Sequence, residues 1–264
     1  MTARSDSSHS KQFQFHILGA FLATYDGEPI GGLDNGRLQS LLADLLLHQE
    51  APLSRQQLAY ALWPETSDRQ ARTNLRTLLA RFQKALDGIP PLLEVTRQTI
   101  RFHSEALLSA DLFVFESALL QAERSTDAST QLTALQNAIQ NYRGDLLPDC
   151  YDEWILPFRE RLRERFLSAL EACSRLLEDG RDYERSIHLC QRLARRDPLC
   201  EAAYRRLMRL HALNGDRGSA LRVYHQCADI LQRELGVEPD DRTQSTYRQL
   251  LQQKGAEAPV HDVS

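Results

Sequence analysis

The sequence lacks the patterns of a membrane or exported protein. No apolar run approaches the ~18–20 residues that are needed to cross a bilayer. The polar stretch over residues 1–12 contains no apolar segment of the kind that a signal peptide has. The five cysteines are scattered, odd in number and without a CxxC pair, so reduced thiols in a cytosolic protein are the simplest interpretation. We therefore expect a cytoplasmic protein that makes no membrane contact.

The sequence also lacks the motifs of common catalytic and cofactor sites. Neither GxxxxGKS/T nor GxGxxG is present, so no phosphate-binding loop is visible. There is no HExxH motif, no Cys/His cluster with metal-ligand spacing and no GxSxG nucleophile elbow. The eight histidines are dispersed along the chain. We expect no catalytic residue, no cofactor and no bound metal, and a protein that is not an enzyme.

Basic residues are concentrated in one part of the chain. The formal net charge of -4 does not by itself point to a polyanionic partner. Within residues 67–101, however, seven basic side chains outnumber three acidic ones. The seven are Arg69, Arg72, Arg76, Arg81, Lys84, Arg97 and Arg101. The window predicts a modest basic patch, for which an ordinary solvated helix face is the alternative explanation.

The first hundred residues have the pattern of a winged helix. The alternation of apolar and polar residues predicts strands at the start, with a hairpin turn at Asp26-Gly27. Apolar spacing and cap residues then predict three helices, and a second pair of short strands follows them. The predicted elements are strands over 13–30, helices over 36–48, 55–62 and 68–86, and strands over 92–96 and 99–103. In a winged helix one helix enters the major groove of DNA, and the hairpin lies beside the phosphate backbone.

The third predicted helix, residues 68–86, has an outer face suited to DNA. This face collects arginines, threonines and a small alanine, and it contains no carboxylate. A purely solvated helix usually mixes charges of both signs. Arginine and threonine can instead lie against phosphates and base edges. We predict Arg69 and Arg76 as base contacts and Lys84 and Arg97 as phosphate contacts. The full predicted set is Arg69, Arg72, Thr73, Arg76, Thr77, Arg81, Lys84, Arg97, Gln98 and Thr99.

From about residue 110 onward, every predicted element is a helix. Gly180 and Gly215 lie 35 positions apart and each precedes a helix, and Ile187 and Leu221 lie 34 apart. Helix pairs with a period of about 34 residues indicate tetratricopeptide-type repeats, which stack into a curved array. An irregular helical bundle is the alternative. The predicted fold class is an α+β winged helix at the N-terminus followed by an all-α tetratricopeptide-like repeat domain, mainly α overall.

Five stretches of the chain carry a resemblance to a known family. They are FHILGAFLATYDGEPI, SRQQLAYALWPETSDRQARTNLRTLLARFQKAL, ADLFVFESALL, NYRGDLLPDCYDEW and RRDPLCEAAYRRLMRLHALNGDRGSALRVYHQCADILQRELGVEPD. In the last stretch, DPLCEAAYRRLM, NGDRGSAL and LGVEP match in order and spacing, which makes it the most specific. From about Phe13 to Gln253 the chain resembles the Streptomyces antibiotic regulatory protein family.

The resemblance implies a transcriptional regulator with a response-regulator type winged helix and a bacterial transcriptional activator domain. Members of the family bind direct-repeat operators near promoters, often as two head-to-tail protomers, and help to recruit RNA polymerase. The expected partners are therefore double-stranded DNA, RNA polymerase and a second copy of the chain on DNA, and the expected location is the nucleoid. The expected domains are a disordered leader (1–11), the winged helix (12–105), the activator domain (106–254) and a disordered tail (255–264).

Two other functions stay open from the sequence alone. A protein-interaction adaptor would work through the surface of the helical repeats, and the chain would then be a fragment of a larger signalling regulator. The balance of 11 basic and 11 acidic residues in the first 105 favours this alternative, because a strong DNA binder is usually basic. An enzyme is the third possibility, and no catalytic constellation supports it.

Overall fold

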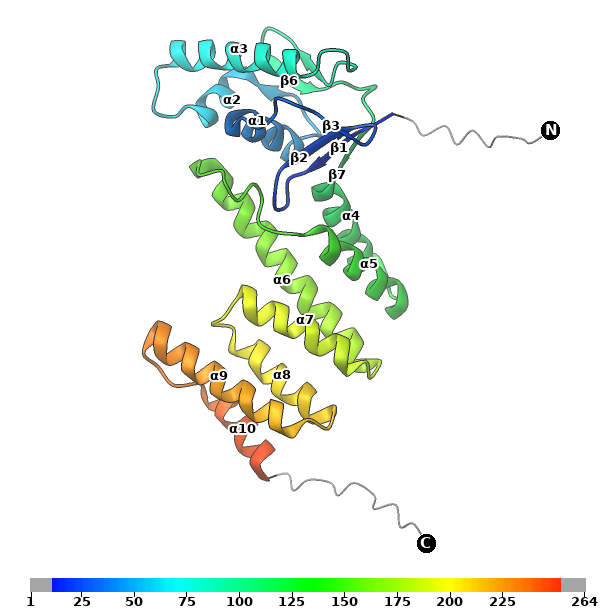
Figure 1. Cartoon of the computed structure of the whole chain (residues 1–264), viewed down its shortest axis with the longest axis vertical. Helices are drawn as coiled ribbons and strands as arrows, with labels where there is room; N and C mark the ends of the chain where they lie inside the picture. The colour runs from blue at the N-terminus through cyan, green and yellow to red at the C-terminus, as the bar shows by residue number, and fades with distance from the viewer. Residues whose placement is uncertain (1–10, 253–264) are drawn as a thin grey trace, which may run out of the picture. The chain divides into compact units, whose positions relative to one another are not determined.

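Strands and helices are mixed over the first part of the described chain, up to Ala110, and helices follow; Figure 1 labels the α-helices and most of the strands. The computed structural model describes residues 11–252. The disordered leader expected at 1–11 and the disordered tail expected at 255–264 lie outside the described residues, apart from Lys11.

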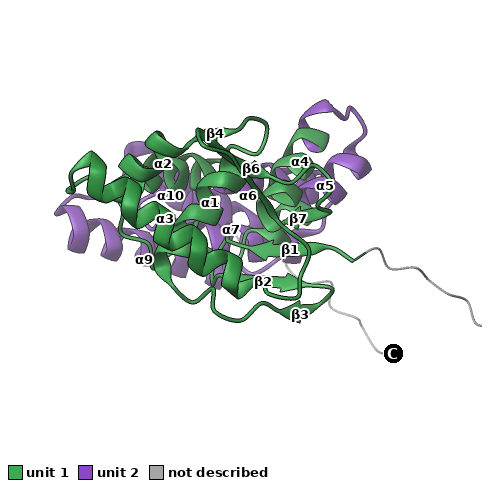
Figure 2. Cartoon of the chain, turned by 90° about the horizontal axis from the view of Figure 1, so that it is seen from above, with its two compact units in different colours: residues 1–121, 137–165 green, residues 122–136, 166–264 purple. Residues whose placement is uncertain are grey.

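Contacts within the chain separate it into two compact units, which Figure 2 shows in different colours. The first unit holds residues 1–121 and 137–165, and the second holds residues 122–136 and 166–264. This division differs from the predicted boundary at 105/106, because the segment just after that boundary pairs with the first strand. As a division of the sequence into domains, the boundary stays a prediction.

Four strands form the first sheet of the first unit. They are β1 (Phe13–His16), β2 (Leu22–Tyr25), β3 (Glu28–Pro29) and β7 (Leu108–Ala110), in the spatial order β3-β2-β1-β7. β1 runs antiparallel to β2 and parallel to β7. The predicted hairpin turn is confirmed between β2 and β3, where Asp26 and Gly27 have φ angles of 55° and 85°. Positive φ at both central residues is typical of the tight turns that join antiparallel strands.

Three helices follow and enclose an apolar core. They are α1 (Gly36–Leu47), α2 (Arg55–Leu62) and α3 (Asp68–Ala85), each within one residue of its predicted bounds. Each begins after a residue whose side-chain oxygen accepts backbone N–H groups of the first turn, which are otherwise unpaired: Asn35, Ser54 and Ser67. The predicted leucine face of α1 is buried, at Leu38, Leu41, Leu42, Leu45 and Leu46.

A second, three-stranded sheet joins the helices to the predicted hairpin. It consists of β4 (Leu53–Ser54), β5 (Leu93–Val95) and β6 (Thr99–Phe102), in the order β4-β6-β5. β5 and β6 form the predicted hairpin, and β4 pairs with β6 through Leu53–Ile100 and Ser54–Thr99. Because α2 starts directly after β4, this pairing brings the first turn of α2 beside the hairpin.

A buried aspartate connects the first sheet to the helices that follow it. The Asp111 carboxylate accepts the backbone N–H groups of Ile17 at 3.0 Å and Leu18 at 3.1 Å, and it also accepts the N–H of Leu112. Burial raises the pKa of the Asp111 carboxyl, while these hydrogen bonds act in the opposite direction. The side chain therefore satisfies backbone N–H groups just past the end of β1.

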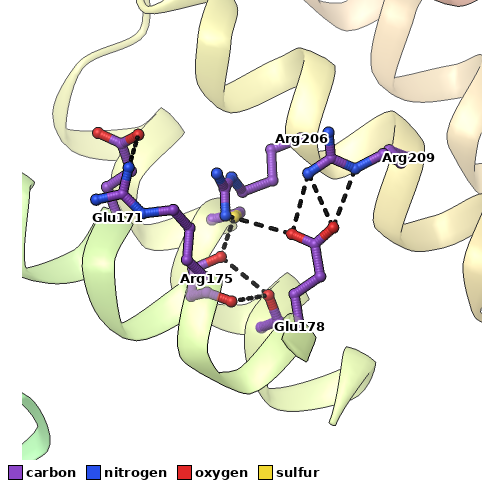
Figure 3. Close-up of polar contacts among 8 residues, drawn as sticks. Glu171, Arg175, Glu178, Arg206 and Arg209 are labelled. Carbon is purple, nitrogen blue, oxygen red and sulfur yellow. Dashed lines mark hydrogen bonds and ion pairs between the residues drawn. The ribbon is translucent and has the colours of Figure 1, made fainter. Parts of the chain in front are cut away.

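The rest of the described chain is helical. Its elements are α4 (Asp111–Arg124), α5 (Ala128–Asn141), the 3-10 helix η1 (Glu153–Ile155), α6 (Leu156–Asp179), α7 (Tyr183–Arg196), α8 (Glu201–Leu213), α9 (Arg217–Leu235) and α10 (Asp241–Gln252). α7 and α9 begin in the same way, 34 positions apart, because Asp182 caps the N–H of Arg185 and Asp216 caps that of Ser219. α8 packs against α7, α9 and α10 in the second unit. In Figure 3, Glu178 near the end of α6 lies beside Arg206 and Arg209 of α8.

Candidate nucleic-acid interface

Helix α3 buries one face and exposes the face that carries the predicted DNA contacts. Its N-terminus is capped by Ser67, whose Oγ accepts the N–H of Gln70 at 3.4 Å. The buried face packs into the core of the first unit through Ala71, Leu75, Leu78, Leu79 and Phe82. The predicted contact residues of the helix are all exposed: Arg69, Arg72, Thr73, Arg76, Thr77, Arg81 and Lys84.

Most of the cations on the exposed face of α3 have no counterion among the described residues. Arg72 lies 3.8 Å from Asp68, one helical turn earlier, and such exposed pairs contribute little to stability. Within residues 11–252, no carboxylate oxygen lies within 4.0 Å of the charged nitrogens of Arg69, Arg76, Arg81 and Lys84. The face therefore presents positive charge that is free to pair with an anion.

The two threonines of this face are bonded to their own helix. The Thr73 hydroxyl donates to the carbonyl of Arg69 at 2.9 Å, and the Thr77 hydroxyl donates to the carbonyl of Thr73 at 3.1 Å. A threonine hydroxyl has a single proton, so neither side chain has a donor left for a ligand. Each still exposes a methyl group.

The tip of the β5–β6 hairpin is held in a defined shape by Thr96. Its Oγ1 accepts the backbone N–H groups of Gln98 at 3.2 Å and Thr99 at 2.9 Å. Farther along the strands, Glu94 and Arg101 form an ion pair at 2.7 Å. Arg97 and Gln98 are exposed at the tip, whereas Thr99 is half-buried at the start of β6.

A groove of about 710 Å³ brings part of the predicted set together. Its lining includes Arg72 and Arg76 of α3 together with Arg97, Gln98 and Thr99 of the hairpin. The other predicted residues of α3 do not line this groove; they lie along the exposed face of the helix: Arg69, Thr73, Thr77, Arg81 and Lys84.

Sequence reasoning missed one cation of the groove. Arg55, the first residue of α2, also lines it. Its backbone N–H donates to the carbonyl of Gln98 at 2.8 Å, and its Nη1 donates to the carbonyl of Thr96 at 3.0 Å. No local pattern marks this residue, because its place beside the hairpin depends on the pairing of β4 with β6. In the sequence, the one sign of this position is that a basic residue directly follows a predicted helix cap.

The part of the chain that the structure describes contains no group of histidine, cysteine, aspartate and glutamate side chains that could hold a metal ion. No helix among these residues is both long enough and apolar enough to cross a membrane. The geometry is that of a binding surface built from cations, methyl groups and a hairpin tip.

Residues 110–251 match the bacterial transcriptional activator domain. The chain belongs to this family. The predicted resemblance to the Streptomyces antibiotic regulatory proteins is thereby confirmed. The expectation of a regulator rather than an enzyme agrees with membership of this family.

Two curated relatives extend the match toward the N-terminus. The chain is 28% identical over 251 residues to the regulatory protein AfsR of Streptomyces coelicolor, which covers 94% of the chain. It is 26% identical over 242 residues to AfsR of Streptomyces griseus, which covers 90% of the chain. The chain spans only about a quarter of the length of these relatives, 25% and 24% respectively.

The fold is also found in a solved structure. Mycobacterium tuberculosis EmbR, determined in complex with a low-affinity phosphopeptide, superposes with a TM-score of 0.70 at 22% identity. The match covers 94% of this chain and 67% of EmbR. The predicted fold class, a winged helix followed by tetratricopeptide-like helices, is confirmed by this likeness.

Proposed function

We propose that this regulator binds double-stranded DNA sequence-specifically, with α3 in the major groove and the β5–β6 hairpin against the phosphate backbone. The observation that carries the proposal is the exposed face of α3. It bears four cations that have no counterion within residues 11–252, and it adjoins a groove that the hairpin tip also lines. Cations without counterions can bind the phosphates of a polyanion, and exposed side chains on a helix can contact the edges of its bases.

The proposed interface has two kinds of contact, one with base edges and one with phosphates. Arg69 and Arg76 are the candidates for base edges, because a guanidinium can bind the O6 and N7 of guanine with two hydrogen bonds. Lys84 and Arg97 are the candidates for phosphates. Phosphate contacts release bound counterions from DNA and supply affinity, whereas base contacts supply specificity.

The proposal also covers how the chain would activate transcription. We infer from membership of the activator family that the chain binds direct repeats near promoters as two protomers and recruits RNA polymerase. Sedimentation with and without operator DNA tests the assembly. Two protomers on one operator are expected, and a single protomer under both conditions would remove the dimer from the proposal.

Selection from a random DNA library with the purified full chain, at near-physiological salt, tests sequence-specific binding. Enrichment of a repeated motif is expected, and the spacing of its halves would report how the protomers are arranged. Absence of enrichment would contradict the proposal and would direct attention to the surface of the helical repeats, where an adaptor would bind its partner.

A further inference from the structure

We propose that Thr73 and Thr77 read thymine through its 5-methyl group, so that each operator half-site contains thymine facing the middle of α3. The inference rests on the proposed function and specifies what the interface recognises. It assigns the 5-methyl group of thymine to two side chains whose hydroxyls already donate hydrogen bonds within the protein.

The hydrogen bonds of the two threonines limit what each can offer to a base. Each hydroxyl proton is donated to the carbonyl four residues earlier, at 2.9 Å for Thr73 and 3.1 Å for Thr77. The O–H groups are therefore not available to the acceptors N7, O6 and O4 in the major groove. Both residues are exposed, so their γ-methyl groups are free for an apolar contact.

The position of the threonines places these methyl groups between two cations. Arg69, Thr73, Thr77 and Arg81 recur every four residues and therefore lie along one line on the helix surface. Arginines at the two ends suit guanine or phosphate, and the methyl groups in the middle suit the methyl of thymine, the one apolar group that a base pair shows in the major groove. Ala80, also exposed, adds a third methyl group to this face.

A hydroxyl oxygen could also accept a hydrogen bond from the amino group of adenine or cytosine. Substitutions separate the two contacts. Serine keeps the hydroxyl and its helix bond but removes the methyl, whereas valine keeps a methyl and removes the hydroxyl. A methyl contact predicts that valine preserves recognition and that serine loses it.

The experiment uses the full chain and the duplex enriched from the random library. Each thymine of a half-site is replaced in turn by deoxyuridine, which removes only the 5-methyl group. At one or two positions we expect the affinity of the wild type to fall about fourfold, the factor that corresponds to burying one methyl group. At those positions Thr73→Ser or Thr77→Ser should bind thymine and deoxyuridine equally, and the matching valine variant should still prefer thymine.

Thr133→Ser provides a matched control. Thr133 is exposed on α5 and donates to the carbonyl of Ser129 at 2.9 Å, so it has the same helix bond outside the proposed interface. Its substitution should leave the affinity and the thymine preference unchanged.

Four results would overturn the inference. They are a half-site without thymine, equal binding of thymine and deoxyuridine by the wild type, a preference that survives serine, and a preference that is lost with valine. An enriched motif without methyl dependence overturns this inference alone. Failure to enrich any motif overturns the proposed function and this inference together.

Discussion

Arg55 holds the tip of the β5–β6 hairpin from the side of α2. Its backbone N–H and its guanidinium donate to the carbonyls of Gln98 and Thr96, the two neighbours of Arg97. A single residue thus fixes the backbone on both sides of the cation that is expected to meet a phosphate. This makes Arg55 a positioning residue, acting through Arg97.

A double-mutant cycle tests this role. Arg55→Ala and Arg97→Ala should each weaken binding to the enriched duplex, and the double variant should lose less than the sum of the two. Coupled residues of this kind typically show interaction free energies of about 0.5–3 kcal/mol. Arg101→Ala is the control, because Arg101 pairs with Glu94 on the same hairpin and does not line the groove. Additive losses would contradict the positioning role.

The three buried cysteines of the second unit, Cys173, Cys190 and Cys227, should react slowly with alkylating reagents. Burial raises the pKa of the Cys173 thiol to about 11 and that of Cys227 to about 12, and it also raises the pKa of Cys190. The thiolate is the reactive form, so a raised pKa leaves little of it at pH 8. Iodoacetamide at pH 8 should therefore label the half-exposed Cys150 and Cys200 first, as measured by peptide mass spectrometry. Equal labelling of all five in the native protein would contradict the described burial.

At the level of secondary-structure elements, a charged network links α6 to α8 (Figure 3). The Glu178 carboxylate accepts from Arg206 at 3.3 Å and from Arg209 at 3.0 and 3.1 Å, and its side chain is only 18% exposed. One turn earlier on α6, the buried Ser174 bonds to Ser186 of α7 at 2.9 Å. These contacts join three successive helices of the second unit.

Removing the charge of Glu178 should loosen the pairing of α6 with α8. Glu178→Gln leaves two guanidinium groups without their carboxylate, and hydrogen bonds to charged groups contribute about 1.5–3 kcal/mol. We expect the free energy of opening of α8 to fall by about 1.5–3 kcal/mol, so that its backbone amides exchange hydrogen faster. The control is Glu171→Gln, whose pair with Arg175 is exposed and should contribute no more than about 0.5 kcal/mol. Equal effects of the two substitutions on hydrogen exchange of α8 would contradict this role of Glu178.

The helices were predictable because their apolar periodicity is a local property. The bounds of α1, α2 and α3 agree with prediction to within one residue. The short strands β4 and β7 were not predicted, because two or three residues cannot show a period and each strand depends on a distant partner. The exposed face of α3 followed from the same periodicity, whereas the role of Arg55 required the pairing of β4 with β6.

At the level of the whole chain, the net charge is -4, so overall attraction to DNA cannot explain the proposed binding. Local cations must supply it, and their effect is measurable in the salt dependence. The logarithm of the binding constant falls with the logarithm of salt concentration by about 0.9 for each phosphate that is contacted. Arg97→Ala should reduce this slope by about one such unit. Arg76→Ala should leave it nearly unchanged, because Arg76 is expected at a base edge. An unchanged slope for Arg97→Ala would remove it from the phosphate contacts.

The central claim is that the exposed face of α3 reads DNA sequence. Affinities of the wild type and of Arg76→Ala for the enriched duplex and for a scrambled duplex, at one salt concentration, test it most directly. A lost arginine–guanine contact corresponds to about 1–3 kcal/mol, or roughly 5- to 150-fold, so we predict a loss of that size on the enriched duplex and a much smaller loss on the scrambled one. Equal losses on both duplexes would show that Arg76 contributes only charge, and would contradict the account.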